Sequence, residues 1–372
     1  MKILIATGLY PPDIGGPATY TVFLEKHLER HGVAYEVLPY NIVRKYPKII
    51  RHVAYLVKLL LHARGVTVFY ALDTVSVGLP VCIAGFITRK PYLLRVPGDY
   101  AWEQGQQRYG VTELLDTFQL RKKYPLPVRV LVCIQRLVAR RALHIIAPSE
   151  YMKGIVALWG LSIQNITRVY TELKEIFIVD SKEVLRDGFH YTGFVISTAA
   201  RFVPWKGLDG VIRVTHILRE EGLPVSLEII GDGVLRNSLE ALVDTLHARA
   251  YIHFLGAISH QEVGRRVKSA DVFVLNTSYE GLSHHLIEAM SLETPIITTP
   301  VGGNRELIED MKTGIFVPYQ DDVALAQAIR QLIQDVSLGK MLARDAKKKV
   351  SHFHEDVVIE EFVRLLHTLW KF

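Results

Sequence analysis

Short runs of β-branched and aliphatic residues alternate with longer, helix-length segments throughout the chain, and this alternation constrains the fold more than any other feature. Such alternation is typical of parallel sheets built from β-α-β units. The pattern therefore predicts two parallel sheets covered by helices. The expected strands are Lys2–Thr7, Tyr35–Leu38, Val66–Tyr70, Tyr92–Val96 and His144–Ala147 in the first half, and Phe194–Ala199, Val225–Ile230, Ile252–Leu255, Val272–Leu275, Pro295–Thr298 and Ile315–Val317 in the second.

Chain length agrees with two sheets, because 372 residues are about twice the ~150 residues of a typical domain. The segment from Asp180 to Gly193 is polar and shows no sustained period, so we place the connection between domains there. We expect one Rossmann-like domain over residues 1–185 and a second over residues 190–355. Open parallel sheets bind ligands at the carboxyl ends of their strands. Loops that follow strands are therefore the places to look for a site.

Several function classes are excluded at this stage. The two cysteines, Cys82 and Cys133, form no CxxC pair, so neither a disulfide framework nor a cysteine-based zinc site is expected. No apolar stretch reaches the ~20 residues of a membrane-spanning helix, and the first residues are too short an apolar run for a secretory signal. A composition of 49% hydrophobic and 22% charged residues is typical of soluble globular proteins. A cytoplasmic location is expected.

Positive charge gathers in the first half, where residues 1–180 hold 23 Lys and Arg against 13 Asp and Glu, whereas residues 181–372 hold 21 against 25. Mixtures of cations with Leu, Val, Ile and Tyr are typical of helices that lie on anionic membranes. Solvated helix faces are the alternative, and nucleic acid is not favoured because no binding motif accompanies the charge. The two clusters are Arg44, Lys45, Lys48, Arg51 and Lys58, and Arg121, Lys122, Lys123, Arg129, Arg136, Arg140 and Arg141.

Glycines and cations mark two candidate loops. Gly15 and Gly16 follow the first strand, where paired glycines let backbone amides approach an anion near a helix N-terminus, although a flexible turn is the alternative. Arg201 and Lys206 follow the strand Phe194–Ala199. Two fixed cations there can hold a diphosphate and stabilise the charge that grows as it leaves, unless they are only surface cations. The chain has no Asp-x-Asp sequence, so we expect no metal site and no cofactor.

A third candidate is the segment after the strand Val272–Leu275. Ser283 is a plausible N-cap, and the amides that follow it would point at an anion. Glu280 lies in the loop and Glu288 more than one helical turn further on, so they can contact different parts of one extended ligand. Solvated or ion-paired glutamates are the alternative. The adjacent His284 and His285 point to different helix faces, which argues against a joint metal site.

Other nucleotide motifs are weak. Gly231-Asp232-Gly233 follows a strand, but Arg236 replaces the third glycine of a dinucleotide-binding fingerprint, which argues against an oxidoreductase. The chain has neither a Walker A loop nor a Gly-x-Ser-x-Gly elbow.

In this order the motifs resemble family 4 retaining glycosyltransferases of the GT-B fold, over nearly the whole chain. The family pattern of Arg, Lys-Gly, Gly-Asp-Gly and Glu-x7-Glu matches Arg201, Lys206-Gly207, Gly231-Asp232-Gly233, and Glu280 with Glu288. The resemblance implies an α/β fold of two Rossmann-like parallel α/β/α domains facing across a cleft. It also implies that a last helix, about residues 356–372, packs back on the first domain. Further matches are the loop Gly15-Gly16 and the segments Ala147–Tyr151 and Pro295–Glu306.

The resemblance also implies residue roles. Arg201 and Lys206 would bind the donor diphosphate, Glu288 the ribose, and Glu280 the transferred sugar. The amides of residues 281–283 would assist Glu280, and Gly231 and Ile258 would lie near the base. The implied nucleotide-sugar site comprises Gly15, Gly16, Arg201, Lys206, Gly231, Ile258, Glu280, Gly281, Leu282, Ser283 and Glu288.

One position departs from the family pattern. Members usually carry a His after the fourth strand, where this chain has Gly98 followed by Asp99. We expect Asp99 or Glu103 to replace this His, or the donor sugar to lack a primary hydroxyl group. Asp99 is therefore a candidate catalytic residue together with Arg201, Lys206 and Glu280, and a turn former before Tyr100 is its alternative role.

The sequence thus predicts a metal-independent glycosyltransferase that closes its two domains around the donor. It would move a sugar, with retention, from a UDP-, GDP- or other nucleotide-diphosphate sugar to a hydroxyl of a glycan or lipid-linked acceptor. The alternatives are a sucrose-phosphate-type synthase with a soluble sugar-phosphate acceptor and a catalytically silent nucleotide-sugar-binding protein. The basic N-terminal domain would attach the protein peripherally to the inner face of the membrane, in polysaccharide or glycolipid biosynthesis.

Overall fold

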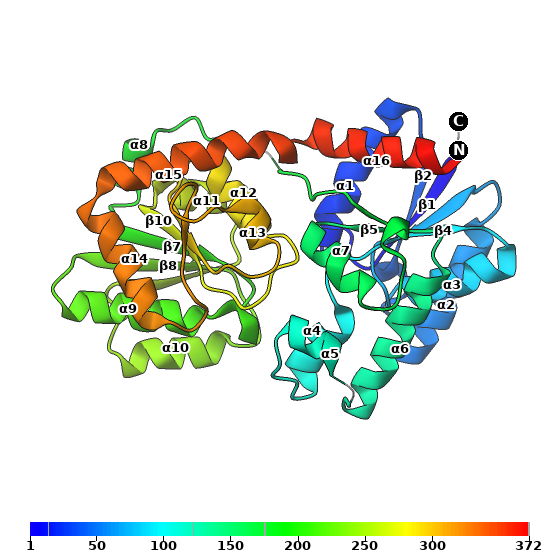
Figure 1. Ribbon diagram of the computed structural model, residues 1–372, viewed down its shortest axis with the longest axis horizontal. Coiled ribbons are helices and arrows are strands. Elements are labelled where there is room, and N and C mark those ends of the chain that lie inside the picture. Colours follow the sequence, from blue (N-terminus) through cyan, green and yellow to red (C-terminus); the bar gives the residue numbers. More distant parts are fainter. Residues whose placement is uncertain (14, 122, 175, 371–372) are drawn as a thin grey trace. The chain divides into compact units, whose positions relative to one another are not determined.

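The computed structural model describes residues 1–13, 15–121, 123–174 and 176–370. They form two compact units, each with its own six-stranded sheet and helices on both faces of that sheet (Figure 1). Residues 1–172 and the C-terminal segment from residue 355 make up the first unit, and residues 173–354 make up the second.

Every strand pair in the first sheet is parallel, in the order β2-β1-β3-β4-β5-β6. The inner strands β3, β4 and β5 are buried along their whole length, because helices cover both faces. The expected strands are all present, and β6 is an additional one that the sequence analysis missed. The strands are β1 (Lys2–Thr7), β2 (Ala34–Pro39), β3 (Val68–Ala71), β4 (Tyr92–Arg95), β5 (His144–Ala147) and β6 (Ile166–Arg168).

The last helix of the chain belongs to the first unit. Its side chains Val358, Ile359, Phe362 and Leu366 are buried in one cluster with Ile3, Ile5 and Leu24, and the ring of Phe362 stacks on Tyr70 at 5.3 Å. The helices of this unit are α1 (Gly16–Leu28), α2 (Lys48–His62), α3 (Gly78–Thr88), α4 (Tyr100–Arg108), α5 (Leu115–Leu120), α6 (Leu126–Arg141), α7 (Glu150–Ala157) and α16 (Glu355–Trp370), with 3-10 turns η1 (Glu29–His31), η2 (Tyr40–Val43) and η3 (Ile163–Asn165).

The second sheet is also parallel, in the order β12-β11-β10-β7-β8-β9. Its strands are β7 (Phe194–Ala199), β8 (Val225–Ile230), β9 (Ile252–Gly256), β10 (Val272–Leu275), β11 (Ile296–Thr298) and β12 (Ile315–Phe316). Its helices are α8 (Lys182–Gly188), α9 (Leu208–Glu220), α10 (Arg236–Thr245), α11 (His260–Ser269), α12 (His284–Ser291), α13 (Asn304–Leu307), α14 (Asp322–Gln334) and α15 (Val336–Lys348), with 3-10 turns η4 (Pro204–Lys206) and η5 (Lys349–Phe353).

The segment in which we expected the interdomain connection, Asp180–Gly193, lies inside the second unit. It forms α8, whose N-cap Ser181 accepts a hydrogen bond from the Val184 amide. Arg186 fastens this helix to the start of β10 through a 2.7 Å ion pair with Asp271. A helix of seven residues is too short to show a clear hydrophobic period in the sequence. Its partner Asp271 lies 85 positions from Arg186, so the sequence does not reveal that this segment belongs to the second unit.

Across the described residues, none of the helices combines the length and the apolar character that crossing a bilayer requires.

Candidate functional site

The candidate site lies in the second unit, at the point where its strand order reverses. Strand β7 comes first along the chain among the strands of this sheet, and it has β8 on one side and β10 on the other. The loops after β7 and β10 therefore leave adjacent strands in opposite directions, and open α/β sheets bind ligands at such a point. Arg201 and Lys206 come from the first of these loops, and Glu280 comes from the second.

A close backbone approach shapes the loop after β7. Gly207 has φ 51° and caps α9, and a Cβ atom there would collide with the carbonyl oxygen of Asn276. Glycine is the residue that tolerates both the left-handed backbone and the contact. It allows this loop to lie directly against the loop after β10, which brings Lys206 to Glu280.

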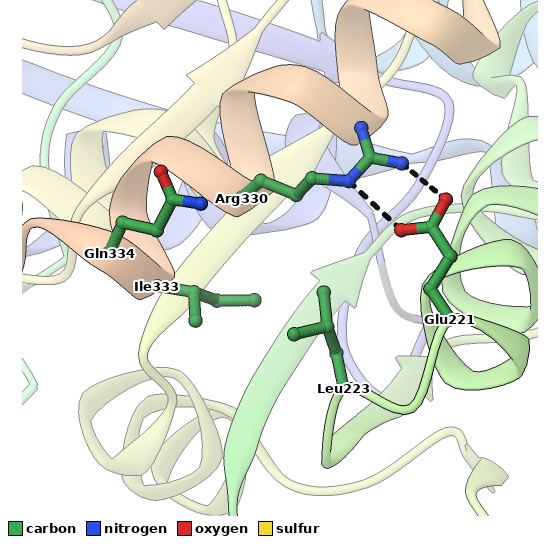
Figure 2. A pocket seen from close by; sticks show the side chains of 5 residues that line it. All are labelled: Glu221, Leu223, Arg330, Ile333 and Gln334. Atoms are coloured by element: carbon green, nitrogen blue, oxygen red, sulfur yellow. Dashed lines mark hydrogen bonds and ion pairs between the residues drawn. The ribbon is translucent and has the colours of Figure 1, made fainter.

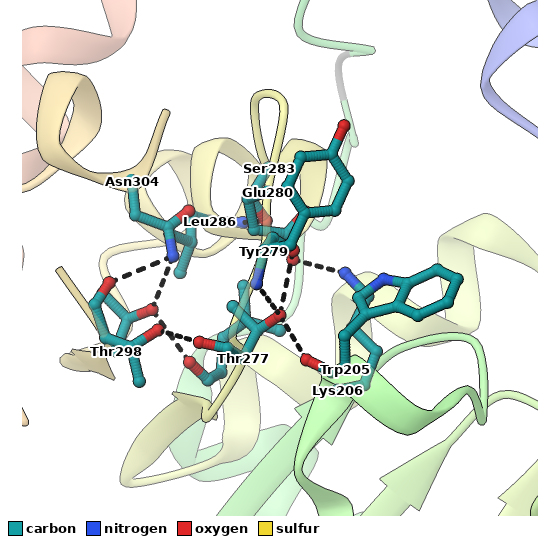
Figure 3. Close-up of polar contacts among 11 residues, drawn as sticks. Trp205, Lys206, Thr277, Tyr279, Glu280, Ser283, Leu286, Thr298 and Asn304 are labelled. Atoms are coloured by element: carbon teal, nitrogen blue, oxygen red, sulfur yellow. Dashed lines mark hydrogen bonds and ion pairs between the residues drawn. The ribbon is translucent and has the colours of Figure 1, made fainter. Parts of the chain in front are cut away.

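Lys206 and Glu280 are paired in the structure, with Nζ of the lysine donating to Oε1 of the glutamate (Figure 3). Both side chains are largely buried, with 12% and 11% of their surfaces exposed. An ammonium group has three N–H donors, so this pairing leaves donors on Lys206 for a further acceptor.

Buried polar side chains join the two loops. Oγ1 of Thr277 donates to the carbonyl of Trp205 at 2.9 Å, and Nδ2 of Asn276 donates to the carbonyl of Gly207 at 3.2 Å. Thr277, Tyr279 and Trp205 form one connected cluster beside Glu280 (Figure 3). Because these bonds fix both backbones, the charged side chains start from a preorganised frame.

A third loop, after β11, completes the frame. The Gly303 amide donates to the carbonyl of Glu280 at 3.0 Å. Nδ2 of Asn304 donates to Oγ1 of Thr298 at 3.1 Å and to the carbonyl of Thr299 at 3.2 Å. Glu280 is thus held by two loops, through Lys206 at its side chain and through Gly303 at its carbonyl.

The predicted helix N-terminus is present. Ser283 is the N-cap of α12, and its Oγ accepts a hydrogen bond from the Leu286 amide at 3.3 Å. Gly281, Leu282 and Ser283 are buried and lead directly into this helix. The positive end of the helix dipole therefore lies next to Glu280 and Lys206 and favours an anionic group.

Glu288 lies on α12 with 10% of its side chain exposed. Nε2 of His260 is 2.8 Å from Oε1, and Nδ1 of His285 is 3.0 Å from Oε2. Burial alone would raise the pKa of Glu288, but hydrogen bonds from the two histidines outweigh burial and hold it well below its usual range. His260 was not among the residues predicted from the sequence. The sequence signal for this position is Ser259 followed three residues later by Glu262, a pattern typical of a helix start. Oγ of Ser259 accepts a hydrogen bond from the Glu262 amide at 3.2 Å and caps α11, which places His260 in the first turn.

The loops after β8 and β9 lie beside each other. The Gly231 amide donates to the carbonyl of Gly256 at 2.9 Å. Gly231 has φ 123°, and a Cβ atom at this position would collide with the carbonyl oxygen of Ala200. Ile258 is half-buried in the loop that leads from β9 to His260. Gly231 and Ile258 thus lie at the same edge of the sheet as Lys206 and Glu288.

The three remaining predicted binding residues are Arg201, Gly15 and Gly16. Arg201 follows β7 and is exposed, while its carbonyl accepts a hydrogen bond from the Val203 amide at 2.9 Å. Gly15 and Gly16 belong to the first unit, where Gly15 caps α1 and Gly16 is the first residue of that helix.

Asp99, a predicted catalytic residue, forms a helix cap in the structure. Asp99 is fully buried in the first unit and caps α4, with Oδ1 accepting from the Trp102 amide at 2.9 Å. Its carboxylate also accepts from Gln119 at 2.8 Å and from Gln135 at 3.1 Å. Burial raises the pKa of this carboxyl group. Because its acceptor sites face protein donors rather than solvent, Asp99 has the alternative role, forming the turn before Tyr100.

One pocket in the second unit lies away from these residues. It is lined by Glu221, Leu223, Arg330, Ile333 and Gln334, with Arg330 and Glu221 joined by two hydrogen bonds (Figure 2). Leu223 lies two residues before β8, so the pocket lies at the amino end of that strand. Ligands of parallel sheets bind at the opposite edge, and the pocket is therefore not part of the candidate site.

No cluster of three or more His, Cys, Asp or Glu side chains suited to a metal ion occurs within residues 1–13, 15–121, 123–174 and 176–370.

Residues 184–349 match the family model for glycosyl transferases group 1. The matched region lies inside the second unit and contains Lys206, Glu280 and Glu288. This region of the second unit is therefore similar to group 1 glycosyltransferases.

Two curated relatives extend this finding. The chain is 28% identical over 314 residues to CapM of Staphylococcus aureus, a capsular polysaccharide biosynthesis glycosyltransferase, and the match covers 80% of this chain and 76% of CapM. It is 28% identical over 176 residues to EpsD of Bacillus subtilis (strain 168), covering 47% of this chain and 46% of EpsD. The chain thus spans about half the length of EpsD and three quarters of CapM.

A solved structure matches the whole chain. The crystal structure of Anabaena HepE in complex with UDP and glucose aligns with a TM-score of 0.78 and 18% identity, over 99% of this chain and 100% of that one. This similarity, together with the two parallel sheets, confirms the predicted GT-B fold class.

Proposed function

We propose that the chain is a glycosyltransferase that moves a sugar, with retention and without a metal ion, from a nucleotide-diphosphate sugar to a hydroxyl group of a glycan or lipid-linked acceptor. The observation that carries the proposal is the Lys206–Glu280 pair at the reversal point of the second sheet, beside the N-terminus of α12.

Lys206, Arg201 and the α12 N-terminus are the groups that would hold the donor diphosphate. Transfer breaks the bond between the sugar and the diphosphate, so negative charge grows on the leaving phosphate. Fixed positive groups stabilise this charge most in the transition state, which is where stabilisation accelerates a reaction. Their number and placement support departure of the diphosphate without a metal ion.

Glu280 and Glu288 would contact the sugar and the ribose, respectively. Glu280 is held by Lys206 and by the Gly303 amide at its own carbonyl, so its carboxylate has a fixed position next to the diphosphate groups. Carboxylates accept hydrogen bonds from sugar hydroxyls. Retention rests on the resemblance to family 4 and is tested by the anomeric configuration of the product.

UDP-sugars and polysaccharide acceptors are the first candidates, because HepE was crystallised with UDP and glucose and CapM acts in capsular polysaccharide biosynthesis. The test measures release of nucleoside diphosphate and transfer of labelled sugar from UDP-, GDP- and ADP-sugars, with glycan, lipid-linked and soluble sugar-phosphate acceptors. Stabilisation by a donor without turnover on any acceptor would indicate a silent nucleotide-sugar-binding protein instead. Transfer to sugar phosphates alone would indicate a sucrose-phosphate-type synthase.

The acceptor is proposed to reach the enzyme at an anionic membrane surface. Helix α3 packs against both α2 and α6 in the first unit (Figure 1). On α2, four apolar side chains spaced along one face are exposed, and α3 and α6 add more, including Phe86 with 75% exposure. Apolar helix faces in soluble proteins are normally buried. The exposed set is Ile50, Val53, Val57 and Leu61 on α2, Ile83, Phe86 and Ile87 on α3, and Leu126, Val130 and Leu137 on α6.

The charge of this three-helix face favours an anionic bilayer over a second copy of the protein as its binding partner. The three helices contain no Asp or Glu, whereas Lys58, Arg129, Arg140 and Arg141 are exposed on them. Two copies of a uniformly cationic face repel each other, but anionic lipid headgroups attract it, at about 1 kcal/mol for each cation near the surface. Lys122 of the predicted basic cluster lies outside the described residues.

Co-sedimentation with phosphatidylglycerol and phosphatidylcholine vesicles tests the membrane proposal. Wild type should bind the anionic vesicles at low salt and release them at high salt. Leu61→Glu combined with Phe86→Glu should abolish binding, and Val323→Glu, at an exposed apolar position of the second unit, is the matched control. Failure to bind phosphatidylglycerol, or binding unchanged in the double variant, would leave the three-helix face a solvated surface.

A further inference from the structure

We infer that His260 and His285 are positioning residues for the Glu288 carboxylate and that, through it, they determine how well the nucleotide ribose is recognised. This inference rests on the proposed donor site, in which Glu288 faces the ribose.

The two histidines reach Glu288 from different elements. His260 is the first residue of α11, and His285 lies on α12 itself, three positions before Glu288. Each oxygen of the carboxylate has one partner, at 2.8 Å from Nε2 of His260 and 3.0 Å from Nδ1 of His285. The carboxylate is therefore fixed in both rotation and tilt.

The direction of these hydrogen bonds follows from the chemistry of the groups. An ionised carboxylate only accepts, so Nε2 of His260 and Nδ1 of His285 both carry protons. Each carboxylate oxygen accepts more than one hydrogen bond. One acceptor position on each oxygen thus remains for a ligand, which suits two neighbouring hydroxyl donors such as the 2′ and 3′ hydroxyls of ribose.

Histidines suit this task better than the other basic side chains. A buried carboxylate needs hydrogen bonds to remain ionised. An arginine fork would take both oxygens in a bidentate pair along the edge that the ligand needs. Two single N–H donors from separate elements keep Glu288 ionised and leave its remaining acceptor positions available.

The positioning role is separable from a general structural role by comparing two ligands. A nucleotide without ribose hydroxyls makes no bond to Glu288, so its affinity should not depend on how the carboxylate is oriented. UDP and 2′,3′-dideoxy-UDP form such a pair of probes. GDP and ADP with their dideoxy counterparts are used in the same way if the chain selects another base.

Isothermal titration calorimetry on the full chain tests the inference. His260→Leu and His285→Leu should each weaken UDP binding by about tenfold or more and leave dideoxy-UDP binding unchanged. His260→Gln and His285→Asn place an amide N–H near the original donor nitrogen, and should restore UDP affinity to within about threefold of wild type. His253→Leu, at an exposed histidine on β9, is the matched control.

Three outcomes overturn the inference. In the first, the leucine variants bind UDP as wild type does. In the second, they lose UDP and dideoxy-UDP affinity equally, as a structural role requires. In the third, wild type binds none of UDP, GDP and ADP, and the proposed function then fails as well. If His260→Leu does not fold, His285→Leu decides the matter, because His285 is 41% exposed and its removal leaves no cavity.

Discussion

Lys206 and Glu280 form an ion pair through Nζ and Oε1, although 74 positions separate them in the sequence. The pair exists because β7 and β10 are adjacent in the second sheet and because Gly207 lets their loops touch. Both groups are largely buried. A buried pair of this kind adds little to stability by itself, but its position at the reversal point of the sheet makes Lys206 the best-placed group to meet an anion.

We expect Lys206→Ala to reduce turnover by about 10²- to 10³-fold, the usual effect of removing one preorganised stabiliser of developing charge. Arg201→Ala should also lower the rate of sugar transfer. The measurement is the steady-state rate of nucleoside diphosphate release under saturating donor. Lys347→Ala is the matched control, since Lys347 pairs with Glu293 on the surface of the same unit. Turnover of both site variants within a few-fold of wild type would contradict the assigned roles.

Metal removal should leave the enzyme active. Because Lys206, Arg201 and the α12 N-terminus are proposed to stabilise the leaving diphosphate, wild-type turnover in excess EDTA should equal that in magnesium-containing buffer. The decisive comparison is between EDTA-treated enzyme with and without added Mg²⁺ or Mn²⁺. Activity that disappears with EDTA and returns with either ion would refute the metal-independent mechanism.

Much of the fold was predictable from the sequence, because parallel strands that are covered by helices on both faces consist of short, continuous runs of apolar residues. β6 was missed because it has only three residues, of which Ile166 alone is buried. The boundary near Glu172 was missed for a different reason. The chain passes between the units without a change in composition, and the Leu173 amide pairs with the Phe353 carbonyl, a partner far along the chain.

The candidate site was predictable where a motif sets both residue type and position, as for Lys206, Glu280 and Ser283. The supporting contacts of Asn304 and His260 were not, since they depend on which loops become neighbours in three dimensions. Asp99 illustrates the opposite case. Its position was read against a family pattern, whereas its local context, an acidic residue three positions before the Trp102 amide, describes an N-cap.

Asp99→Ala should therefore destabilise the first unit rather than slow chemistry. It removes a helix cap and leaves the side-chain amides of half-buried Gln119 and buried Gln135 without their acceptor, a combined cost of about 2–4 kcal/mol. Thermal unfolding should shift downward by about 5 °C or more, while UDP affinity, which we propose to depend on the second unit, should stay unchanged. An unaltered melting temperature together with lost turnover would return Asp99 to the catalytic site.

Glu172, the last residue of the first unit before the crossing, carries a different electrostatic signature. It is 2% exposed, and neither carboxylate oxygen has a hydrogen-bond partner among the described residues. Burial raises its pKa to about 7, although the Arg95 guanidinium acts in the opposite direction. Arg95 is itself buried and lies 3.7 Å from the centre of the Tyr20 ring.

The sign of the resulting pH dependence is defined. In the unfolded chain Glu172 releases its proton near pH 4.5, whereas in the folded protein it holds the proton until about pH 7. Stability contributed by the protonated group is therefore fully present below pH 4.5 and is lost as pH rises to about 7, by up to roughly 3 kcal/mol.

Glu172→Gln keeps the shape and cannot ionise, so its melting temperature should fall less than that of wild type between pH 5 and pH 7.5. The check is a thermal melt of both proteins across this range, with Glu360→Gln, on the exposed face of α16, as the control that should follow wild type. Parallel curves for wild type and Glu172→Gln would mean that Glu172 is ionised in the folded state, paired with Arg95.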